Sequence, residues 1–452
     1  MLKLSFYGGA RSVTGANYLL ETDKTKILVD CGLHQGSRYC EKHNFEPFAY
    51  DPKTIDAVLV THAHIDHTGR LPQLVKTGFN GRIFSTPPTK DFAEPLLIDS
   101  GGLMAKEAEE RKMPLLYDSN DVKKTMEIWE TIEYRQKFKI KDFEIEFFNA
   151  GHILGSAIIK ISVAGKKIVF SGDLGNVTAP LINEADPIPE ADYAIIESAY
   201  GNRIHKTLEN RKDRLEDAIE DTVRAGGTLM IPAFAMERTQ DLLFEINELA
   251  ENGRIPEVPI FVDSPLAIKI TEIYKKYFRD PSYANGETLA LIEKGDKIFD
   301  FPGLKFTQTT EESKTINDAP PPKIIIAGSG MSQGGRILHH ERRYLPDTKS
   351  MILFIGYQVE GSLGRQILKG AKSVKMFGEE IPVRCKTTVI DGYSAHADSE
   401  KLANWLKPMR LKLKKVFVVQ GEEDQALGLA RKIRDELAIE ATAPLTRETV
   451  VL

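Results

Sequence analysis

The chain has 452 residues, 42% of them hydrophobic and 28% charged, with a net charge of −5 at neutral pH. This length favours two domains over one, and the net acidity excludes a global basic field, so a nucleic acid would need a local basic surface. No apolar run approaches the roughly 18 residues of a membrane helix. The cysteines are odd in number and no signal peptide precedes them, so we expect reduced thiols in a cytoplasmic protein, at Cys31, Cys40 and Cys385.

The first part of the chain contains apolar stretches separated by short polar turns. Residues 2–9, 17–32 and 143–173 are predicted to form antiparallel hairpins. The later chain repeats a different unit, in which a β-branched strand and a short polar or glycine-rich turn precede an amphipathic helix. Strands that alternate with helices in this way predict an α/β architecture, with a mixed, sandwich-like first domain.

Polar residues stand just beyond the predicted carboxyl ends of several strands. Open α/β sheets bind ligands at that edge, where loops carry chemistry on a rigid scaffold. These residues are Asp30, His62, Asp173, Glu197 and His396.

Three of the ten histidines lie in one stretch of six residues, HAHIDH, at positions 62–67. A divalent metal binds imidazole nitrogens and carboxylate oxygens at about 2.0–2.2 Å. His62 and His64 are two residues apart and can face one way from an extended loop. Asp66 and His67 follow as the chain turns into a helix, so they face a neighbouring point. This pattern suits two adjacent metals better than one.

Further ligands occur in matching contexts. His152 lies in a glycine-flanked loop between strands, and Asp173 follows an apolar strand directly, where its carboxylate could bridge two ions. Asp30 is predicted to orient a ligand rather than to bind metal itself. Taken alone, His152 and Asp173 would more often be ordinary loop residues, so the prediction depends on the whole set.

The order of Asp30, HAHIDH, His152 and Asp173 resembles the metallo-β-lactamase superfamily. Glu197 in IIESAYGNR and His396 in GYSAHAD resemble two further motifs of its β-CASP branch, the nucleases that include the polyadenylation endonuclease and ribonuclease J. The resemblance covers essentially the whole chain. It implies an α/β fold in which an αββα metallo-β-lactamase sandwich, residues 1–205 and 385–452, is interrupted by an inserted α/β β-CASP domain, residues 206–384.

The resemblance also implies a metal-dependent phosphodiester hydrolase that cleaves RNA as an endonuclease, an exonuclease or both. Two zinc ions are expected, with manganese as a substitute, because two ions about 3.5–4 Å apart can bind a hydroxide and a phosphate oxygen together. Asp66 would orient that hydroxide as well as bind metal. His396 would protonate the departing 3′ oxygen, with Glu197 holding its ring and raising its pKa.

One position departs from the pattern of the RNA-cutting enzymes. Gln420, in VVQGEED, stands where those enzymes usually have a histidine ligand, whereas DNA-cutting relatives commonly have valine there. An amide is a poor zinc ligand beside imidazole, so the second metal is expected to bind more weakly. Two alternatives therefore stay open: a DNA nuclease of the same branch, and a weakly active RNA-binding relative with an impaired second metal site.

Substrate contacts are expected from the inserted domain. The small residues in GSGMSQGG can expose backbone N–H groups to a phosphate, although close helix–strand packing explains such a turn about as well. The expected partner is single-stranded RNA, no membrane association is expected, and a homodimer is left open. The candidate contacts are Ser329, Gly330, Met331, Tyr357 and Arg365.

Overall fold

The protein is described here by a computed structural model covering residues 1–36, 42–176, 180–205, 210–390 and 392–452. Cys40 lies outside these residues, whereas Cys31 and Cys385 are buried free thiols. Among the described helices, none is both long and apolar enough to cross a membrane. The chain forms two compact units. The first contains Met1–Val177, Ile182–Ile204 and Ala395–Leu452, and the second contains Thr178–Leu181 and His205–Ser394.

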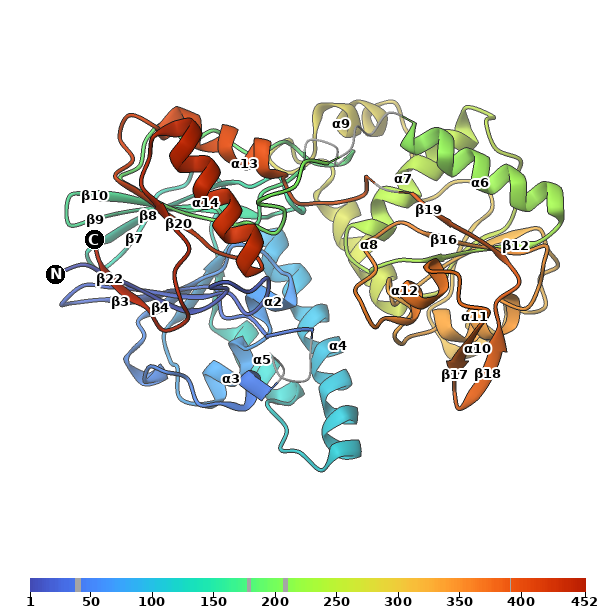
Figure 1. Ribbon diagram of the computed structural model, residues 1–452, viewed down its shortest axis with the longest axis horizontal. Helices are drawn as coiled ribbons and strands as arrows, with labels where there is room; N and C mark the ends of the chain where they lie inside the picture. Colours follow the sequence, from blue (N-terminus) through green and yellow to red (C-terminus); the bar gives the residue numbers. More distant parts are fainter. Residues whose placement is uncertain (37–41, 177–179, 206–209, 391) are drawn as a thin grey trace. The chain divides into compact units, whose positions relative to one another are not determined.

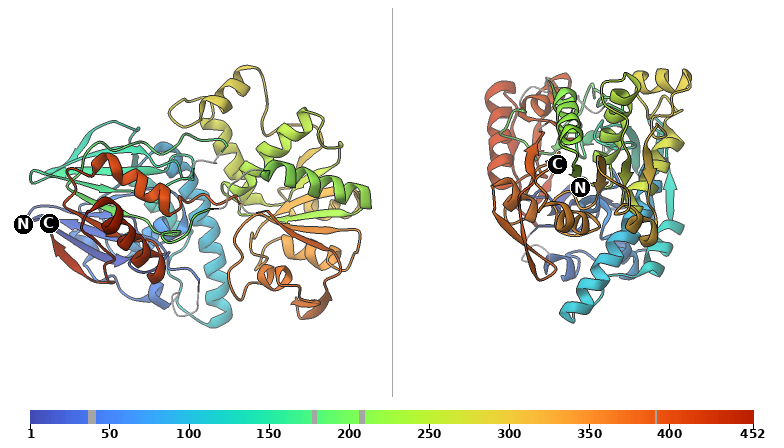
Figure 2. Two further views of the ribbon diagram at one scale, coloured as in Figure 1. Left: turned by 45° about the horizontal axis from the view of Figure 1, so that its top comes forward. Right: turned by 90° about the vertical axis from the view of Figure 1, so that its right-hand side faces the viewer.

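The first unit is built on two seven-stranded sheets. One sheet has the order β22-β1-β2-β3-β4-β5-β6, in which β1, β2 and β3 pair antiparallel, as predicted, and β3 to β6 pair parallel. Its strands are β1 (Lys3–Gly8), β2 (Asn17–Glu21), β3 (Lys26–Val29), β4 (Ala57–Leu59), β5 (Arg82–Ser85), β6 (Trp129–Thr131) and β22 (Thr449–Val451). Because β22 pairs with β1, the two chain ends lie side by side, as Figure 2 shows.

The second sheet of this unit has the order β21-β20-β11-β10-β9-β8-β7. In β8, Phe143, Ile145 and Phe147 are buried, while Glu144 and Glu146 are partly exposed, so one face of the strand enters the core. The strands are β7 (Phe138–Ile140), β8 (Phe143–Asn149), β9 (Ala157–Val163), β10 (Lys166–Phe170), β11 (Tyr193–Ile196), β20 (Lys415–Val418) and β21 (Ala441–Thr442).

The two sheets enclose one hydrophobic core, and helices cover their outer faces. Phe6 and Leu20 of the first sheet share a cluster with Ile145 and Ile159 of the second. Figure 1 shows α13 and α14 over the second sheet and α3 and α5 over the first. The expected αββα sandwich is therefore confirmed. Its helices are α2 (Ile65–Thr68), α3 (Leu71–Lys76), α4 (Pro87–Arg111), α5 (Ser119–Glu127), α13 (Ser399–Leu406) and α14 (Glu423–Leu437), with 3-10 turns η1 (His43–Phe45), η2 (Pro52–Thr54) and η3 (Lys407–Met409).

The second unit is the expected inserted α/β domain, with a parallel six-stranded sheet in the order β14-β13-β15-β12-β16-β19. Every residue of β12 and β15 is buried, because helices cover both faces of such a sheet. The strands are β12 (Thr228–Pro232), β13 (Ile260–Val262), β14 (Leu304–Phe306), β15 (Lys323–Ala327), β16 (Met351–Phe354) and β19 (Lys386–Val389), beside the hairpin β17 (Ser373–Met376) and β18 (Glu379–Pro382).

The helices of the second unit follow its strands, as the repeated strand–turn–helix pattern predicts. They are α6 (Arg211–Ala225), α7 (Arg238–Glu251), α8 (Pro265–Tyr277), α9 (Gly286–Glu293), α10 (Thr310–Thr315), α11 (Ile337–Tyr344) and α12 (Leu363–Leu368). Because β19 pairs with β16, residues 386–389 belong to this sheet. The two units accordingly divide between Ser394 and Ala395, ten residues after the division expected from the sequence.

Candidate metal centre

The histidine-rich loop begins where two neighbouring parallel strands end. β3 and β4 pair in parallel, so Asp30, one residue beyond β3, lies beside the start of the loop beyond β4. Asp30 Oδ1 accepts a hydrogen bond from the Thr61 backbone N–H, and Oδ2 accepts one from the Thr61 hydroxyl, both at 2.8 Å. Asp30 therefore fixes the residue that directly precedes His62.

Three histidines and one aspartate converge on one point of the first unit. His64 Nδ1 lies 3.1 Å from His62 Nε2 and 3.2 Å from His152 Nε2. Asp173 Oδ2 lies 3.5 Å from His62 Nε2 and 3.7 Å from His152 Nε2. All four ligand atoms lie within 4.8 Å of one another.

This spacing fits a divalent ion. Zinc–nitrogen bonds of about 2.0–2.1 Å in tetrahedral geometry put two ligand nitrogens about 3.3 Å apart, close to the separations of the three imidazoles. Burial holds the pKa of His62 well below its usual range, and neighbouring His67 acts in the same direction. Burial would raise the pKa of Asp173, but His67 and His62 lower it well below its usual range. Neutral imidazole and ionised carboxylate are the forms that bind metals.

Two loops from distant parts of the chain meet at this point. Gly175 lies so close to Gly151 that a Cβ on Gly175 would stand 1.6 Å from the Gly151 carbonyl oxygen. The Gly175 backbone N–H donates to the carbonyl of Ala150 at 2.9 Å. This approach, which only glycine allows, brings the loop with His152 against the loop with Asp173.

The second expected set of ligands lies on the other side of Asp173. His67 Nε2 is 3.4 Å from Asp173 Oδ1 and 3.8 Å from Asp66 Oδ2. His67 Nδ1 is 2.8 Å from Asp30 Oδ2, so Asp30 holds the ring with Nε2 towards Asp173. Burial raises the pKa of Asp66. Asp173 thus has one oxygen towards each set, which is the arrangement expected of a bridging carboxylate.

Gln420 lies beside His67, as expected, but its amide is engaged in other contacts. Its Nε2 is 3.1 Å from His67 Nε2 and donates to the Val13 carbonyl at 2.9 Å. Its Oε1 accepts a hydrogen bond from the Tyr18 hydroxyl at 3.4 Å. The group that faces His67 is therefore an amide N–H, which has no lone pair for a metal and competes for the lone pair of His67.

His396 and Glu197 form a pair on the first unit. His396 Nδ1 lies 3.3 Å from Glu197 Oε2 and 3.9 Å from Asp173 Oδ2. Glu197 is buried at the end of β11, where its Oε1 also accepts the Leu174 backbone N–H at 2.6 Å. Burial raises the pKa of Glu197, although His396 opposes this. The pair shares Asp173 with the three-histidine set, and the ligand atoms of Asp173, Glu197 and His396 lie within 4.8 Å of one another.

The placement of His396 differs in one respect from the expectation. The sequence suggested a position just beyond a strand, but β19 ends at Val389, seven residues earlier. The backbone of His396 instead forms an isolated antiparallel bridge with Gly175. The loop that carries Asp173 therefore positions His396, rather than the end of a sheet.

The five expected substrate contacts belong to the second unit. Ser329 Oγ accepts the Gln333 backbone N–H at 3.0 Å, and the carbonyls of Gly330 and Met331 accept from Gln358 Nε2 and the Gly364 N–H. Tyr357 is 58% exposed. Arg365 Nε is 3.5 Å from Glu360 Oε2. Ser329, Gly330, Met331 and Tyr357 closely follow β15 and β16, so they share the carboxyl edge of that sheet, whereas Arg365 belongs to α12.

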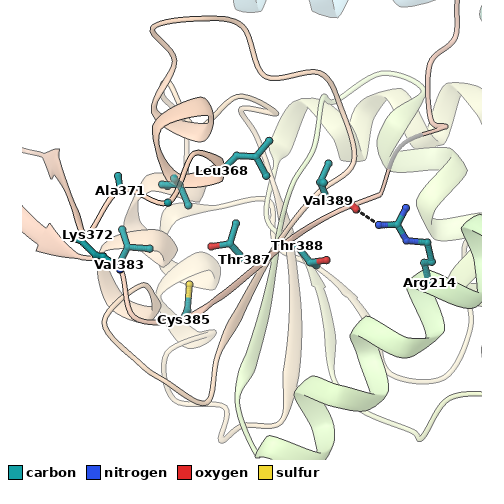
Figure 3. A pocket seen from close by; sticks show the side chains of 11 residues that line it. Arg214, Leu368, Ala371, Lys372, Val383, Cys385, Thr387, Thr388 and Val389 are labelled. Carbon is teal, nitrogen blue, oxygen red and sulfur yellow. Dashed lines mark hydrogen bonds between the residues drawn. The ribbon is translucent and has the colours of Figure 1, made fainter. Parts of the chain in front are cut away.

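The second unit also contains a cavity of about 370 Å³ that no predicted site residue lines. Figure 3 shows it beside β19, with Arg214 donating to the Val389 carbonyl at 2.5 Å. Its lining includes Lys372, Cys385 and Thr387, but no carboxylate. Nothing in this lining suits metal-dependent hydrolysis, so the buried histidine–carboxylate cluster is the candidate site.

Sequence reasoning missed some residues that position the site. Thr61 links Asp30 to the histidine loop, and Tyr18 and Val13 engage the amide of Gln420. Only the position of Thr61, directly before His62, could have indicated its role from the sequence. Tyr18 and Val13 are about 400 residues from Gln420, so no local pattern could have indicated them.

Replacing Asp30 by asparagine should lower the affinity for zinc by about 10- to 100-fold, the usual cost of losing a group that orients a metal ligand. The neutral amide would no longer offer a charged acceptor to His67 Nδ1, so the ring would be less firmly oriented. A chelator-competition titration measures the affinity. Asp142→Asn is a matched control, because Asp142 also accepts bonds from threonine hydroxyls, those of Thr22 and Thr25. Equal zinc affinity in the parent and Asp30→Asn proteins would contradict this role.

Three family models match successive parts of the chain. They are a metallo-beta-lactamase superfamily domain at residues 19–191, a Beta-Casp domain at residues 239–367 and a Zn-dependent metallo-hydrolase RNA specificity domain at residues 380–444. A crystal structure of a protein of unknown function from Enterococcus faecalis covers 100% of both chains, with a TM-score of 0.58 and 12% identity, and shares the fold.

Several named proteins are similar over nearly the whole chain. A ribonuclease from Thermus thermophilus is 35% identical over 94% of both chains. An RNase J-like protein from Methanocaldococcus jannaschii is 34% identical over 98% of both chains. The transcription termination factor FttA from Methanosarcina mazei is 34% identical over 100% of this chain and 72% of its own length.

A sandwich with a histidine–carboxylate cluster at its strand ends is the architecture of a metallohydrolase. The inserted sheet domain, which the Beta-Casp model matches, distinguishes one family within that class. The chain belongs to the β-CASP family of the metallo-β-lactamase superfamily.

Proposed function

We propose that this protein is a metal-dependent ribonuclease that hydrolyses phosphodiester bonds in single-stranded RNA. The observation that carries the proposal is the shared position of Asp173. Its carboxylate belongs both to the three-histidine set and to the pair of His396 and Glu197. A metal site and a candidate proton donor therefore meet at one residue. The names of two relatives, a ribonuclease and an RNase J-like protein, support RNA as the substrate.

His62, His64, His152 and Asp173 would hold one ion, and Asp66, His67 and Asp173 would hold a second. Three imidazoles and a carboxylate favour zinc, and manganese is a reasonable substitute where oxygen ligands dominate. Bound divalent ions would activate water as the nucleophile and neutralise charge on the phosphate.

Side chains of the protein would orient the attacking water and protonate the leaving oxygen. Asp66 would accept a hydrogen bond from the attacking water and orient it towards the phosphorus. His396 would give a proton to the departing 3′ oxygen through Nε2, because Glu197 engages Nδ1. Glu197 would hold the ring in that orientation. Its second oxygen, Oε1, accepts the Leu174 N–H and so ties the pair to the loop that carries Asp173.

Cleavage of matched RNA and DNA oligonucleotides by zinc- and manganese-loaded protein tests the substrate class, since only RNA carries the 2′-hydroxyl. Cleavage of the RNA but not the DNA is expected. Cleavage of DNA alone would replace this proposal with that of a DNA nuclease. The position of the cut in the RNA, internal or at an end, distinguishes endonuclease from exonuclease action in the same assay.

A cytoplasmic location, which the buried free thiols of Cys31 and Cys385 support, and a homodimer belong to the same proposal.

Gln420 favours a second candidate function, an RNA-binding protein of low activity. Its amide N–H faces His67, so the second ion should bind weakly. Gln420→His should raise the second-site occupancy and RNA cleavage together, because imidazole supplies the missing lone pair. Metal content by mass spectrometry and initial cleavage rates measure the two effects. A parent protein that already binds two ions at full occupancy would contradict the weak second site.

A further inference from the structure

The order of strands in the second unit brings three loops together at one edge of its sheet. β12 lies between β15 and β16, and all three strands run parallel. After β12 the chain continues to β13, which lies on the β15 side of β12. It later passes from β15 to β16, which lies on the other side of β12. At such a switch point the loops beyond the strands diverge and leave a crevice where α/β sheets bind ligands. The loops here begin at Ala233, Gly328 and Ile355.

The loop beyond β12 presents an aromatic side chain at this edge. Phe234 is 41% exposed, although it follows a fully buried strand. A Cβ built on Gly330 would lie 2.7, 2.9 and 3.1 Å from three consecutive ring atoms of Phe234, namely Cδ2, Cε2 and Cγ. Nearly equal distances to consecutive atoms mean that Gly330 lies against a face of the ring rather than its edge. The ring therefore rests on the glycine backbone, and part of its surface stays open to solvent.

Several hydrogen bonds fix this arrangement. Gln358 Nε2 donates to the carbonyls of Gly330 at 2.9 Å and Gly356 at 3.1 Å, so one side chain joins the two glycine loops. The Thr239 hydroxyl donates to the Phe234 carbonyl at 2.7 Å. Gln358 Oε1 is buried and has no hydrogen-bond partner among the described atoms. An exposed ring held rigidly on a backbone floor loses little conformational entropy when a flat partner binds.

We propose that Phe234 is a stacking platform for one unpaired nucleobase of the substrate, a site that rests on the proposed ribonuclease function. Unpaired bases stack on aromatic rings in most single-strand readers. A base fits this position because the exposed group is an uncharged aromatic ring, whose face can stack on a base but offers no charge to a phosphate. Stacking tolerates every base, so the site would contribute affinity and register without sequence preference.

The test compares binding of a short single-stranded RNA with binding of the same RNA carrying an abasic nucleotide at each position in turn. The full chain is used in the His396→Ala background, in which cleavage is expected to be slow enough for binding to be measured. In that protein one abasic position should weaken binding by about 5- to 100-fold, the range for a base stacked on an aromatic side chain. Adding Phe234→Ala should weaken binding of the intact RNA by a similar factor and abolish the penalty at that position alone.

Two further variants distinguish stacking from a structural role. Phe234→Trp should keep the penalty, because indole also stacks. Phe377→Ala is the matched control: Phe377 is 52% exposed in the same unit, but its ring stacks on His339 at 4.8 Å beside the β17–β18 hairpin. It should leave the abasic profile unchanged.

Two results would contradict the proposed stacking role of Phe234. One is unchanged RNA binding in Phe234→Ala; the other is an equal loss for intact and abasic RNA, which would indicate a structural role or a different occupant, such as a protein. Neither result touches the ribonuclease proposal. That proposal fails separately, if the parent protein loaded with metal does not cut RNA.

Discussion

Replacing His396 by alanine is expected to lower the rate of RNA cleavage by about 10²- to 10⁴-fold, the usual contribution of a general acid. Glu197 Oε2 lies 3.3 Å from Nδ1 of this ring, which directs Nε2 away from the carboxylate. Without the imidazole, the 3′ oxygen would have to leave as an alkoxide or take its proton from water. Zinc content and RNA affinity should stay near those of the parent protein, because His396 is outside both expected sets of metal ligands.

Single-turnover cleavage rates at saturating protein measure the chemical step, and filter binding measures affinity. Glu197→Gln should give a smaller loss than His396→Ala, since a glutamine oxygen can still accept from Nδ1 but no longer stabilises an imidazolium. His339→Ala replaces an exposed histidine of the second unit and serves as the control. If His396→Ala cleaves at the parent rate, neither His396 nor Glu197 takes part in proton transfer.

Replacing Asp173 by asparagine should have the largest effect on both metal content and rate. The Asp173 carboxylate faces His62 and His152 through Oδ2 and His67 through Oδ1, so one neutral amide would weaken both metal sites. The amide would also place an N–H group against imidazole nitrogens that should bind a cation. Loss of several kcal/mol of charge stabilisation corresponds to a cleavage rate at least about 10³-fold below that of the parent.

Metal content after dialysis and cleavage rates in excess zinc separate loss of binding from loss of chemistry. Asp192→Asn is a suitable control, because Asp192 accepts the Lys167 backbone N–H on the same unit without facing a histidine. Thermal unfolding of both variants shows whether the fold is retained. A folded Asp173→Asn protein with two ions and parent activity would rule out the bridging role.

The sequence predicted the fold class, and short-range patterns together with a family resemblance grouped the candidate ligands that the structure brings close together. HAHIDH places three histidines on one turn of chain, and the strand–turn–helix repeats indicate where sheets end. Those ends coincide in space once neighbouring strands pair in parallel, as β3 and β4 do. Asp30, His62 and Asp173 could therefore be assigned to one site before any tertiary contact was known.

Features that depend on distant pairing could not be predicted in the same way. Phe234 gains its role from Gly330, nearly one hundred residues later, and from the place of β12 between β15 and β16. The position of His396 depends on a bridge with Gly175, which its own local sequence does not indicate. The sequence predicts that the amide of Gln420 is a poor metal ligand, but its hydrogen bond to the Val13 carbonyl is visible only in the folded structure.

The interleaved strand order of the first unit has a consequence for synthesis on the ribosome. β20 pairs with β11, and β22 pairs with β1. Neither sheet can therefore be completed before the last part of the chain has been synthesised. Until then the buried residues of β11 form an unpaired apolar edge, the kind of surface that templates aggregation. Most of the inserted unit is one continuous stretch, His205–Ser394, and can fold while the sandwich is still incomplete. A nascent chain whose residues up to about 395 have left the ribosome would thus carry a complete insert and an incomplete sandwich, and it would depend on chaperones to protect those edges.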